Sequence, residues 1–316
     1  MADLTRRTVL AGGLALAACR PALPVSASGA AGIRVEVDGV PIHLSRSGRG
    51  PAVCLIHGAS GNLNDMTFRL APALANRFEV IAVDRPGHGL SGLPEGGGVS
   101  IQRQAALLRG ALARIGIERA MLVGHSYGGS VALAWAVDAP ETVSGLVLLA
   151  TPSQVWEGGL GLTNDLLASP VTGVPLAHAI PALVTNGFAE RTLATVFAPQ
   201  APPPGYLDHL DLSLVLQPHT LRENARQLVA LKEEIRPMVP AYPRLPMPIE
   251  ILHGDADQTV GLDIHSRPFA RQVGHAHLNV PRGVGHMLHQ VATPEVVARI
   301  EQLSPASGGF SSPRPI

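Results

Sequence analysis

The sequence predicts an α/β fold in which a mostly parallel β-sheet is flanked by helices and carries an inserted helical cap. Three observations support this prediction. Short apolar runs alternate with helix-like segments in the first half of the chain. Strand signals disappear between residues 152 and 248 and return at residue 249. A Gly-x-Ser-x-Gly sequence at residues 124–128 stands between an apolar run and a helical pattern.

The first part of the predicted core covers residues 28–151. Its expected strands are apolar or alternate with period two, and its expected helices place apolar residues at intervals of three and four. We expect strands at 33–37, 41–46, 52–56, 79–84, 120–123 and 145–150, and helices at 64–76, 100–115 and 129–139. The continuous apolar strands imply burial on both faces, as in a parallel sheet.

The predicted cap covers residues 152–248, where Pro, Gly and Ala are frequent. Helical patterns occur at 187–197, 205–216 and 219–234, and the apolar spacing of the last is too regular for a flexible linker. The second part of the core then runs from 249 to 303, with strands at 249–254 and 277–280 and a helix at 294–303. A tail at 304–316, rich in Ser, Gly and Pro, is predicted to be disordered.

Composition excludes some classes of partner. The 316 residues suffice for one large α/β domain with an insertion. Lys plus Arg and Asp plus Glu number 24 each, so no basic surface for nucleic acid and no acidic tail is indicated. The two cysteines, Cys19 and Cys54, do not suggest a disulfide framework. Cys54 lies in a predicted central strand and is expected to be a buried, inert thiol.

The N-terminal residues 1–27 are predicted to be an export signal. Arg6 and Arg7 precede an apolar run at 9–18 that is too short to span a bilayer. This arrangement resembles a bacterial twin-arginine signal, which implies a periplasmic or secreted protein. Residues 16–19 resemble a lipobox, which would make Cys19 a lipidated N-terminus and anchor the protein to a membrane. Cleavage after Ala27 is the alternative.

The Gly-x-Ser-x-Gly sequence predicts a nucleophile elbow centred on Ser126. The flanking glycines permit a strained turn that lifts the serine hydroxyl above the end of the sheet. A serine in an ordinary glycine-rich turn is the alternative. A serine hydroxyl needs a base within hydrogen-bond reach and a group that orients the base. We expect both from loops at the carboxyl ends of later strands.

Two later loops supply these groups. Residues 253–260 contain Asp255 and Asp257, and residues 283–287 contain His286. With Ser126, the order Ser, Asp, His resembles the α/β-hydrolase superfamily over residues 33–303. This resemblance implies the α/β-hydrolase fold, with Asp257 rather than Asp255 as the acid and His286 as the base. His289 is expected to be a surface or cap-contact residue.

Two backbone N–H groups are expected to form an oxyanion hole. One belongs to Tyr127, which follows the serine. The other lies in the loop 57–62, where the resemblance implies Ala59 and leaves Ser60 as the alternative. His57 is expected to brace this loop. Residues 84–91 match a further loop of the family that shapes the floor of the site, and no chemical role is assigned to them.

No cofactor and no metal are expected. Among 13 histidines, the close pairs are His275 with His277 and His286 with His289. Neither pair has a Cys, Asp or Glu at a recognisable ligand spacing. The chain also contains no Walker loop and no dinucleotide-binding glycine motif in a suitable context.

The resemblance implies a serine hydrolase that cleaves an ester-like bond through an acyl-enzyme on Ser126. The composition of the cap predicts a small, uncharged and moderately hydrophobic substrate. The serine argues against epoxide hydrolases and haloalkane dehalogenases, whose nucleophile is an aspartate. Three alternatives stay open: a carbon–carbon bond hydrolase, a cofactor-free perhydrolase or haloperoxidase, and a non-catalytic binding protein on the same fold. The sequence does not predict the oligomeric state.

Overall fold

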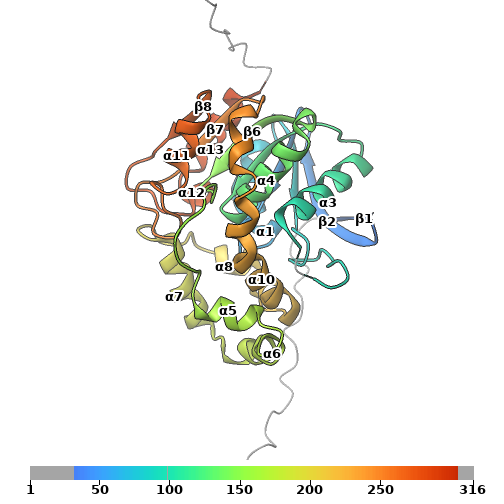
Figure 1. Cartoon of the computed structure of the whole chain (residues 1–316), viewed down its shortest axis with the longest axis vertical. Coiled ribbons are helices and arrows are strands. Elements are labelled where there is room, and N and C mark those ends of the chain that lie inside the picture. Colours follow the sequence, from blue (N-terminus) through green and yellow to red (C-terminus); the bar gives the residue numbers. More distant parts are fainter. Residues whose placement is uncertain (1–31, 98, 305–316) are drawn as a thin grey trace, which may run out of the picture.

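The computed structural model describes residues 32–97 and 99–304 (Figure 1). The predicted export signal, Cys19 and the tail at 305–316 lie outside the described residues, so export and lipidation stay predictions. Among the described residues, no helix combines the length and the apolar character that crossing a bilayer would require.

One eight-stranded sheet forms the centre of the molecule. Its strands are β1 (Ile33–Val37), β2 (Val40–Gly48), β3 (Ala52–Ile56), β4 (Glu79–Val83), β5 (Ala120–His125), β6 (Val143–Leu149), β7 (Ile249–Leu252) and β8 (Ala276–Asn279). Their order across the sheet is β1-β2-β4-β3-β5-β6-β7-β8. The pairs β1–β2 and β2–β4 are antiparallel, and all other neighbours are parallel. The predicted α/β class with a mostly parallel sheet is confirmed.

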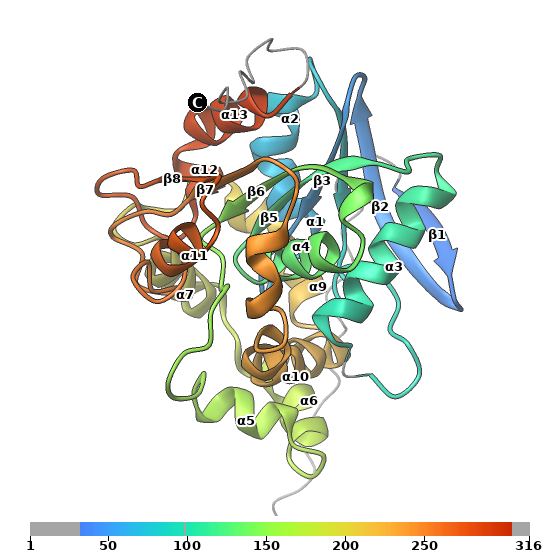
Figure 2. The ribbon, with the colours of Figure 1, turned by 45° about the horizontal axis from the view of Figure 1, so that its top comes forward.

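Helices cover both faces of the sheet (Figure 2). They are α1 (Leu63–Phe68), α2 (Leu70–Leu74), α3 (Ile101–Arg114), α4 (Tyr127–Asp138), α11 (Ser266–Gln272), α12 (Leu288–Val291) and α13 (Thr293–Gln302), with a 3-10 turn, η1 (Pro140–Thr142). Alternate residues of β3 reach opposite faces: Cys54 packs with α3 and α4, and Leu55 packs with α1, α2 and α13. Both are fully buried, as the apolar run predicts. Burial also raises the pKa of Cys54 to about 12, so the thiol is expected to be inert.

The segment between β6 and β7 is helical. It contains α5 (Leu162–Ala168), α6 (Gly173–Leu183), α7 (Asn186–Phe197), α8 (Tyr206–Leu210), α9 (Leu212–Val215), α10 (Pro218–Ile235) and the 3-10 turn η2 (Val239–Arg244). In both ribbon views α5 and α6 lie together at one end of the molecule. We call residues 152–248 the cap.

Several local predictions were wrong in detail. The single helix expected at 64–76 is broken at Arg69, because Pro72 has no N–H to donate to the carbonyl of residue 68. The helix expected at 205–216 is broken at Asp211, whose φ of 57° lies in the left-handed region. The helices α5, α6, α11 and α12 have no counterpart among the predicted elements. Pro175 fits α6 because first-turn N–H groups have no helical partner.

Candidate active site

Ser126 occupies a strained turn between β5 and α4. Its φ of 51° and ψ of −122° are unusual for a residue with a side chain. The Ser126 N–H donates to the carbonyl of Leu149 at 2.8 Å, which holds the turn against the next strand. A Cβ atom on Gly128 would overlap the backbone of β3, and one on Gly124 would overlap the first turn of α4. The two glycines are therefore required for the close packing of this turn.

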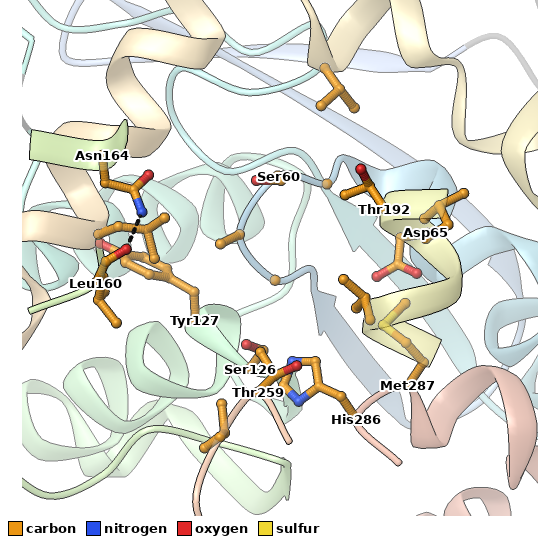
Figure 3. Close-up of a pocket in the computed structure, with 18 of the residues that line it drawn as sticks. Ser60, Asp65, Ser126, Tyr127, Leu160, Asn164, Thr192, Thr259, His286 and Met287 are labelled. Carbon is orange, nitrogen blue, oxygen red and sulfur yellow. Dashed lines mark hydrogen bonds between the residues drawn. The ribbon is translucent and has the colours of Figure 1, made fainter. Parts of the chain in front are cut away.

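Asp257 and His286 meet at the same end of the sheet, from the loops that follow β7 and β8. His286 Nδ1 donates to Asp257 Oδ2 at 2.8 Å, and both side chains are buried. Asp257 Oδ1 accepts the N–H groups of Thr259 and Val260 at 2.7 and 3.0 Å. Both Ser126 and His286 line one cavity (Figure 3). The structure thus brings together the three residues that the sequence singled out.

Hydrogen bonds keep the Asp257 carboxylate ionised. Burial alone would raise its pKa, but hydrogen bonds from His253 and His286 outweigh that effect and hold the pKa well below its usual value. His253 Nε2 lies 3.2 Å from Asp257 Oδ2. Asp255 has a different position, because its Oδ1 accepts the Gly283 N–H at 2.6 Å and ties the two loops together. Asp257, and not Asp255, is therefore the acid that contacts His286.

The loop after β3 contacts the Ser126 turn. A Cβ atom on Gly58 would come within 3.2 Å of the Ser126 Cβ. The Ser60 N–H donates to Asn224 Oδ1 of α10 at 2.7 Å and is therefore occupied. Among the described residues, the N–H groups of Ala59 and Tyr127 have no such acceptor. Of the two candidates in this loop, the geometry favours Ala59 as an oxyanion donor.

His57 braces the loop, as the sequence analysis expected. Its Nδ1 donates to the Gly58 carbonyl at 2.8 Å, and its Nε2 accepts the Arg85 N–H at 3.0 Å. Burial lowers its pKa to about 4, with a smaller contribution from the nearby Arg85 charge, so the ring is neutral at pH 7. Asp84 has a comparable role, since its two carboxylate oxygens accept the N–H groups of Leu63 and Leu90. These residues shape the floor of the site.

A buried polar cluster lies behind Ser126 and His286. Asp65 Oδ1 accepts hydrogen bonds from Tyr206 Oη at 2.8 Å, His289 Nε2 at 2.8 Å and Gln290 Nε2 at 3.1 Å. His125 Nε2 donates to the His286 carbonyl at 3.1 Å, and its ring centroid lies 4.3 Å from that of His289. His289 is not a surface residue, because its side chain is fully buried. It shares its acceptor, Asp65 Oδ1, with Tyr206 of the cap.

Sequence spacing could not reveal this cluster, because Asp65 and His289 are 224 positions apart. Within residues 32–97 and 99–304, Asp65, His125 and His289 are the group whose potential ligand atoms lie close enough to hold a metal ion. A cation at Asp65 Oδ1 would have to displace three hydrogen-bond donors. The hydrogen bonds to Asp65 instead form a network that joins α1, α12 and the cap helix α8.

The cavity above Ser126 has a volume of about 860 Å³. Its wall is formed mainly by aliphatic side chains of the cap, among them Leu167, Ile180, Leu207 and Leu228. Figure 3 shows the few polar groups, with Ser126, Thr259 and His286 near one another and Asn164 on the cap side. Among the described residues the lining contains neither lysine nor arginine. The cavity therefore fits an apolar ligand with one reacting polar group.

Comparisons with known proteins agree with this fold. A fluoroacetate dehalogenase from Burkholderia sp is 38% identical over 119 residues, which are 36% of this chain and 39% of that protein. A 2-hydroxy-6-oxononadienedioate/2-hydroxy-6-oxononatrienedioate hydrolase from Paraburkholderia phymatum is 37% identical over 145 residues, 44% of this chain and 47% of that protein. This chain thus matches less than half the length of either relative.

The structure is also similar to that of Cfl2 from Burkholderia cenocepacia, with a TM-score of 0.72 and 21% identity over 86% of this chain and 95% of that chain. At this identity the similarity concerns the fold alone. The family model described as "alpha/beta hydrolase fold" matches residues 51–292, which span the sheet from β3 to β8 and include the cap. The chain therefore belongs to the α/β-hydrolase fold family.

Proposed function

We propose that this hydrolase is a serine esterase that cleaves uncharged, hydrophobic carboxylic esters through an acyl-enzyme on Ser126. The observation that carries the proposal is the arrangement around the turn after β5. A strained serine faces the same apolar cavity as a histidine whose other ring nitrogen is held by a buried carboxylate at 2.8 Å. Nucleophile, base and orienting group are the parts that acyl transfer by a serine requires.

In the proposed mechanism, Ser126 Oγ attacks the ester carbonyl and its proton passes to His286 Nε2. Asp257 keeps the His286 proton on Nδ1 and stabilises the imidazolium that forms. The N–H groups of Ala59 and Tyr127 bind the negative oxygen of the tetrahedral intermediate. His286 then protonates the leaving alcohol. A water molecule, activated by His286, attacks the acyl-enzyme and releases the carboxylic acid and Ser126.

The lining of the cavity supports an uncharged substrate. A substrate carboxylate that leaves water needs a cation or several donors to replace its hydration. The described lining contains no lysine or arginine, and it includes the Asp65 carboxyl group. The buried Arg85 is committed to the Gly58 carbonyl, Gln104 and Gln227. Anionic substrates such as fluoroacetate or a dienedioate are therefore disfavoured for this chain.

Carbon–carbon bond hydrolysis is the second candidate, favoured by the relative from Paraburkholderia phymatum. It would use the same serine, histidine and aspartate. The substrate named for that relative is a dicarboxylate, which lacks a cationic partner among the described residues that line this cavity. An aspartate-nucleophile reaction, such as dehalogenation by the haloalkane dehalogenase route, is disfavoured because serine occupies the elbow.

The test is the hydrolysis of p-nitrophenyl esters from acetate to palmitate by the wild type, Ser126→Ala and Ser130→Ala. Ser130 is a matched control, because it is buried one turn along α4 and does not itself line the cavity. Its hydroxyl donates to the carbonyl of Pro152, which does line it. We expect Ser126→Ala to lower kcat by about 10⁴-fold or more and Ser130→Ala to keep most of it. A fluorophosphonate probe should label the wild type and Ser130→Ala only.

Labelling of Ser126→Ala would contradict the assignment of the nucleophile. If the wild type reacts with the probe but hydrolyses no ester, vinylogous 1,5-diketones become the discriminating substrates. Their cleavage would establish the carbon–carbon bond hydrolase in place of the esterase.

A further inference from the structure

Exposed apolar side chains are concentrated on the first helices of the cap. The residues in question are Leu162, Leu166, Val171, Val174, Leu183 and Phe188, from α5, α6 and the start of α7. Three of them are strongly exposed: Val171 by 80%, Leu183 by 76% and Leu162 by 71%. We call these six residues the cap patch. Exposed apolar side chains gathered on neighbouring helices mark an interaction site more often than single exposed ones do.

The helix α6 is apolar on both of its sides. Its inner side packs Ala177 against Leu167 of α5 and Ala225 of α10. Its exposed residues include Val174 and Leu183, with His178 as the one polar side chain of the helix. A helix that is apolar all round is stable where both sides meet apolar surroundings. The outer side of α6 therefore lacks a neighbour of the kind that its inner side has.

The cap patch has few formal charges near it: within residues 162–189 the one charged side chain is Asp165, exposed on α5 between Leu162 and Leu166. Residues 166–189 contain no Asp, Glu, Lys or Arg, and the polar groups there are Ser, Thr, Asn and one His. Specific protein–protein interfaces are enriched in Trp, Tyr and Arg and are surrounded by charged residues. None of those three residue types occurs in this segment. The surface resembles the apolar side of a segment that lies in a lipid interface.

The cap patch is continuous with the cavity. Leu183 and Phe188 are both exposed and part of the cavity lining, as is the neighbouring Leu160. The apolar wall above Ser126 therefore extends to the outer surface without a polar rim of charged residues at these positions. A lipid acyl chain could pass from a bilayer into the cavity and stay in apolar surroundings throughout.

We propose that the cap patch docks on a lipid surface and that the cavity receives its substrate, an uncharged lipid-borne ester, directly from that surface. Docking follows from the cap patch alone, whereas the ester substrate rests on the proposed function of Ser126. A second copy of the chain, or a protein partner, is the less favourable occupant. Either would cover Leu183 and Phe188 and block the way from the surface to the cavity.

The test measures binding of the full chain to phosphatidylcholine vesicles by flotation and by hydrogen–deuterium exchange. The variant is Leu162→Ser with Val171→Ser and Val174→Ser, three positions that lie outside the cavity lining. The matched control is Ile33→Ser, an exposed apolar residue on β1 at the far edge of the sheet (Figure 1). Each aliphatic side chain that no longer inserts into the bilayer lowers the partition coefficient of the protein between water and vesicles by about tenfold.

We expect wild type and Ile33→Ser to bind and residues 162–188 to become protected from exchange. The triple variant should lose at least about tenfold in partitioning while its turnover of soluble esters is unchanged. Because the side chains of the cap patch are apolar and Asp165 is the one charge within residues 162–189, binding should change by less than about twofold when salt rises from about 50 to about 500 mM. Adding anionic phosphatidylglycerol should also have little effect.

Protection confined to residues 1–31, or equal binding of the triple variant, would overturn the docking proposal. So would dimerisation without vesicles that the triple substitution abolishes, because the occupant would then be a second copy. Failure of the esterase proposal is distinguishable from these outcomes. In that case vesicle binding through residues 162–188 is retained, while neither soluble nor vesicle-borne esters are hydrolysed.

Discussion

In the core of this α/β-hydrolase fold, buried polar side chains are joined by hydrogen bonds, whereas the cap leaves aliphatic side chains exposed. Asp65 is 3% exposed and accepts three side-chain donors, and Asp257 accepts two backbone N–H groups in addition to His286. In the cap, Val171 and Leu183 are among the most exposed apolar residues of the described chain.

This difference separates two tasks. The core must hold reacting groups in one geometry, and buried hydrogen-bond networks contribute to that rigidity. The cap must accept an apolar ligand, and aliphatic walls do so without demanding one shape. Where the two parts touch, the cap supplies Tyr206 to Asp65 and Asn224 to Ser60. The comparison therefore predicts large effects for changes in the core network and small effects for changes on the exposed cap.

The largest difference is expected between two aspartates, Asp65 of the core and Asp165 of the cap. Asp65→Ala leaves Tyr206, His289 and Gln290 without their acceptor, and each buried unpaired donor costs about 1–3 kcal/mol. We expect the free energy of unfolding to fall by about 3–5 kcal/mol. Asp165→Ala, at an exposed position in the first turn of α5, should cost less than about 1 kcal/mol.

Urea denaturation monitored by circular dichroism gives both values, provided that the slopes with urea agree. Equal stabilities of the two variants would show that the cluster around Asp65 is not a structural network. The contrast between core and cap would then rest on the apolar residues alone.

Much of the core was predictable because its signals are local. The apolar run 52–56 predicted β3 with its observed bounds. A strand that is buried on both faces needs apolar residues at consecutive positions, and such a run is easy to recognise. The sequence around Ser126 predicted a turn between strand and helix, because only glycine fits where a Cβ atom would meet a neighbouring backbone. The choice of Asp257 and His286 needed the family resemblance as well, and the structure brings these residues into contact.

What sequence reasoning missed depends on contacts between distant segments. The burial of His289 is determined by Asp65, which lies 224 positions away. The choice between Ala59 and Ser60 as oxyanion donor depends on Asn224, a cap residue whose Oδ1 already accepts the Ser60 N–H. Helix α5 has only seven residues, too few for a clear helical period. Helix α6 contains Gly173, Pro175 and Pro181, and most of its outer residues are apolar. The usual alternation of apolar and polar faces is therefore absent there.

Acid should weaken the core through its buried histidines. Burial lowers the pKa of His57 and of His265 to about 4, from an ordinary 6.5, and holds those of His88 and His125 well below that value. As pH falls below 6.5, these histidines become protonated in the unfolded chain, whereas His57 and His265 of the folded protein stay neutral until about pH 4. The unfolded state then carries more protons, so stability falls with falling pH, by up to about 1.4 kcal/mol per pH unit for each histidine.

Urea denaturation at several pH values between about 7.5 and 4.5 measures this slope, because stability changes with pH in proportion to the difference in bound protons. His57→Gln removes one of the four rings and should reduce the slope, whereas His178→Gln, at an exposed position of α6, should leave it unchanged. A stability that does not change over this range would contradict the burial of neutral rings in the core.

The smallest effect is expected at the contact between cap and oxyanion loop. Asn224 Oδ1 accepts the Ser60 N–H at 2.7 Å, and Asn224 Nδ2 donates to Ser60 Oγ at 3.1 Å. Asn224→Ala removes both bonds, and a neutral hydrogen bond contributes about 0.5–1.5 kcal/mol. If this contact positions the adjacent Ala59 N–H, the substitution weakens the hydrogen bond to the oxyanion, which forms in the transition state and not in the bound substrate. We therefore expect kcat and kcat/KM to fall together by about tenfold with KM unchanged.

The control is Val229→Ser, an exposed position of the same helix, which should change neither constant. A rise in KM alone would mean that Asn224 acts on substrate binding through the cap. A loss of stability with unchanged kinetics would mean that it only fastens the cap to the core. A fall in kcat would instead show that the cap, which contributes none of Ser126, Asp257 and His286, still helps to set the geometry in which those residues react.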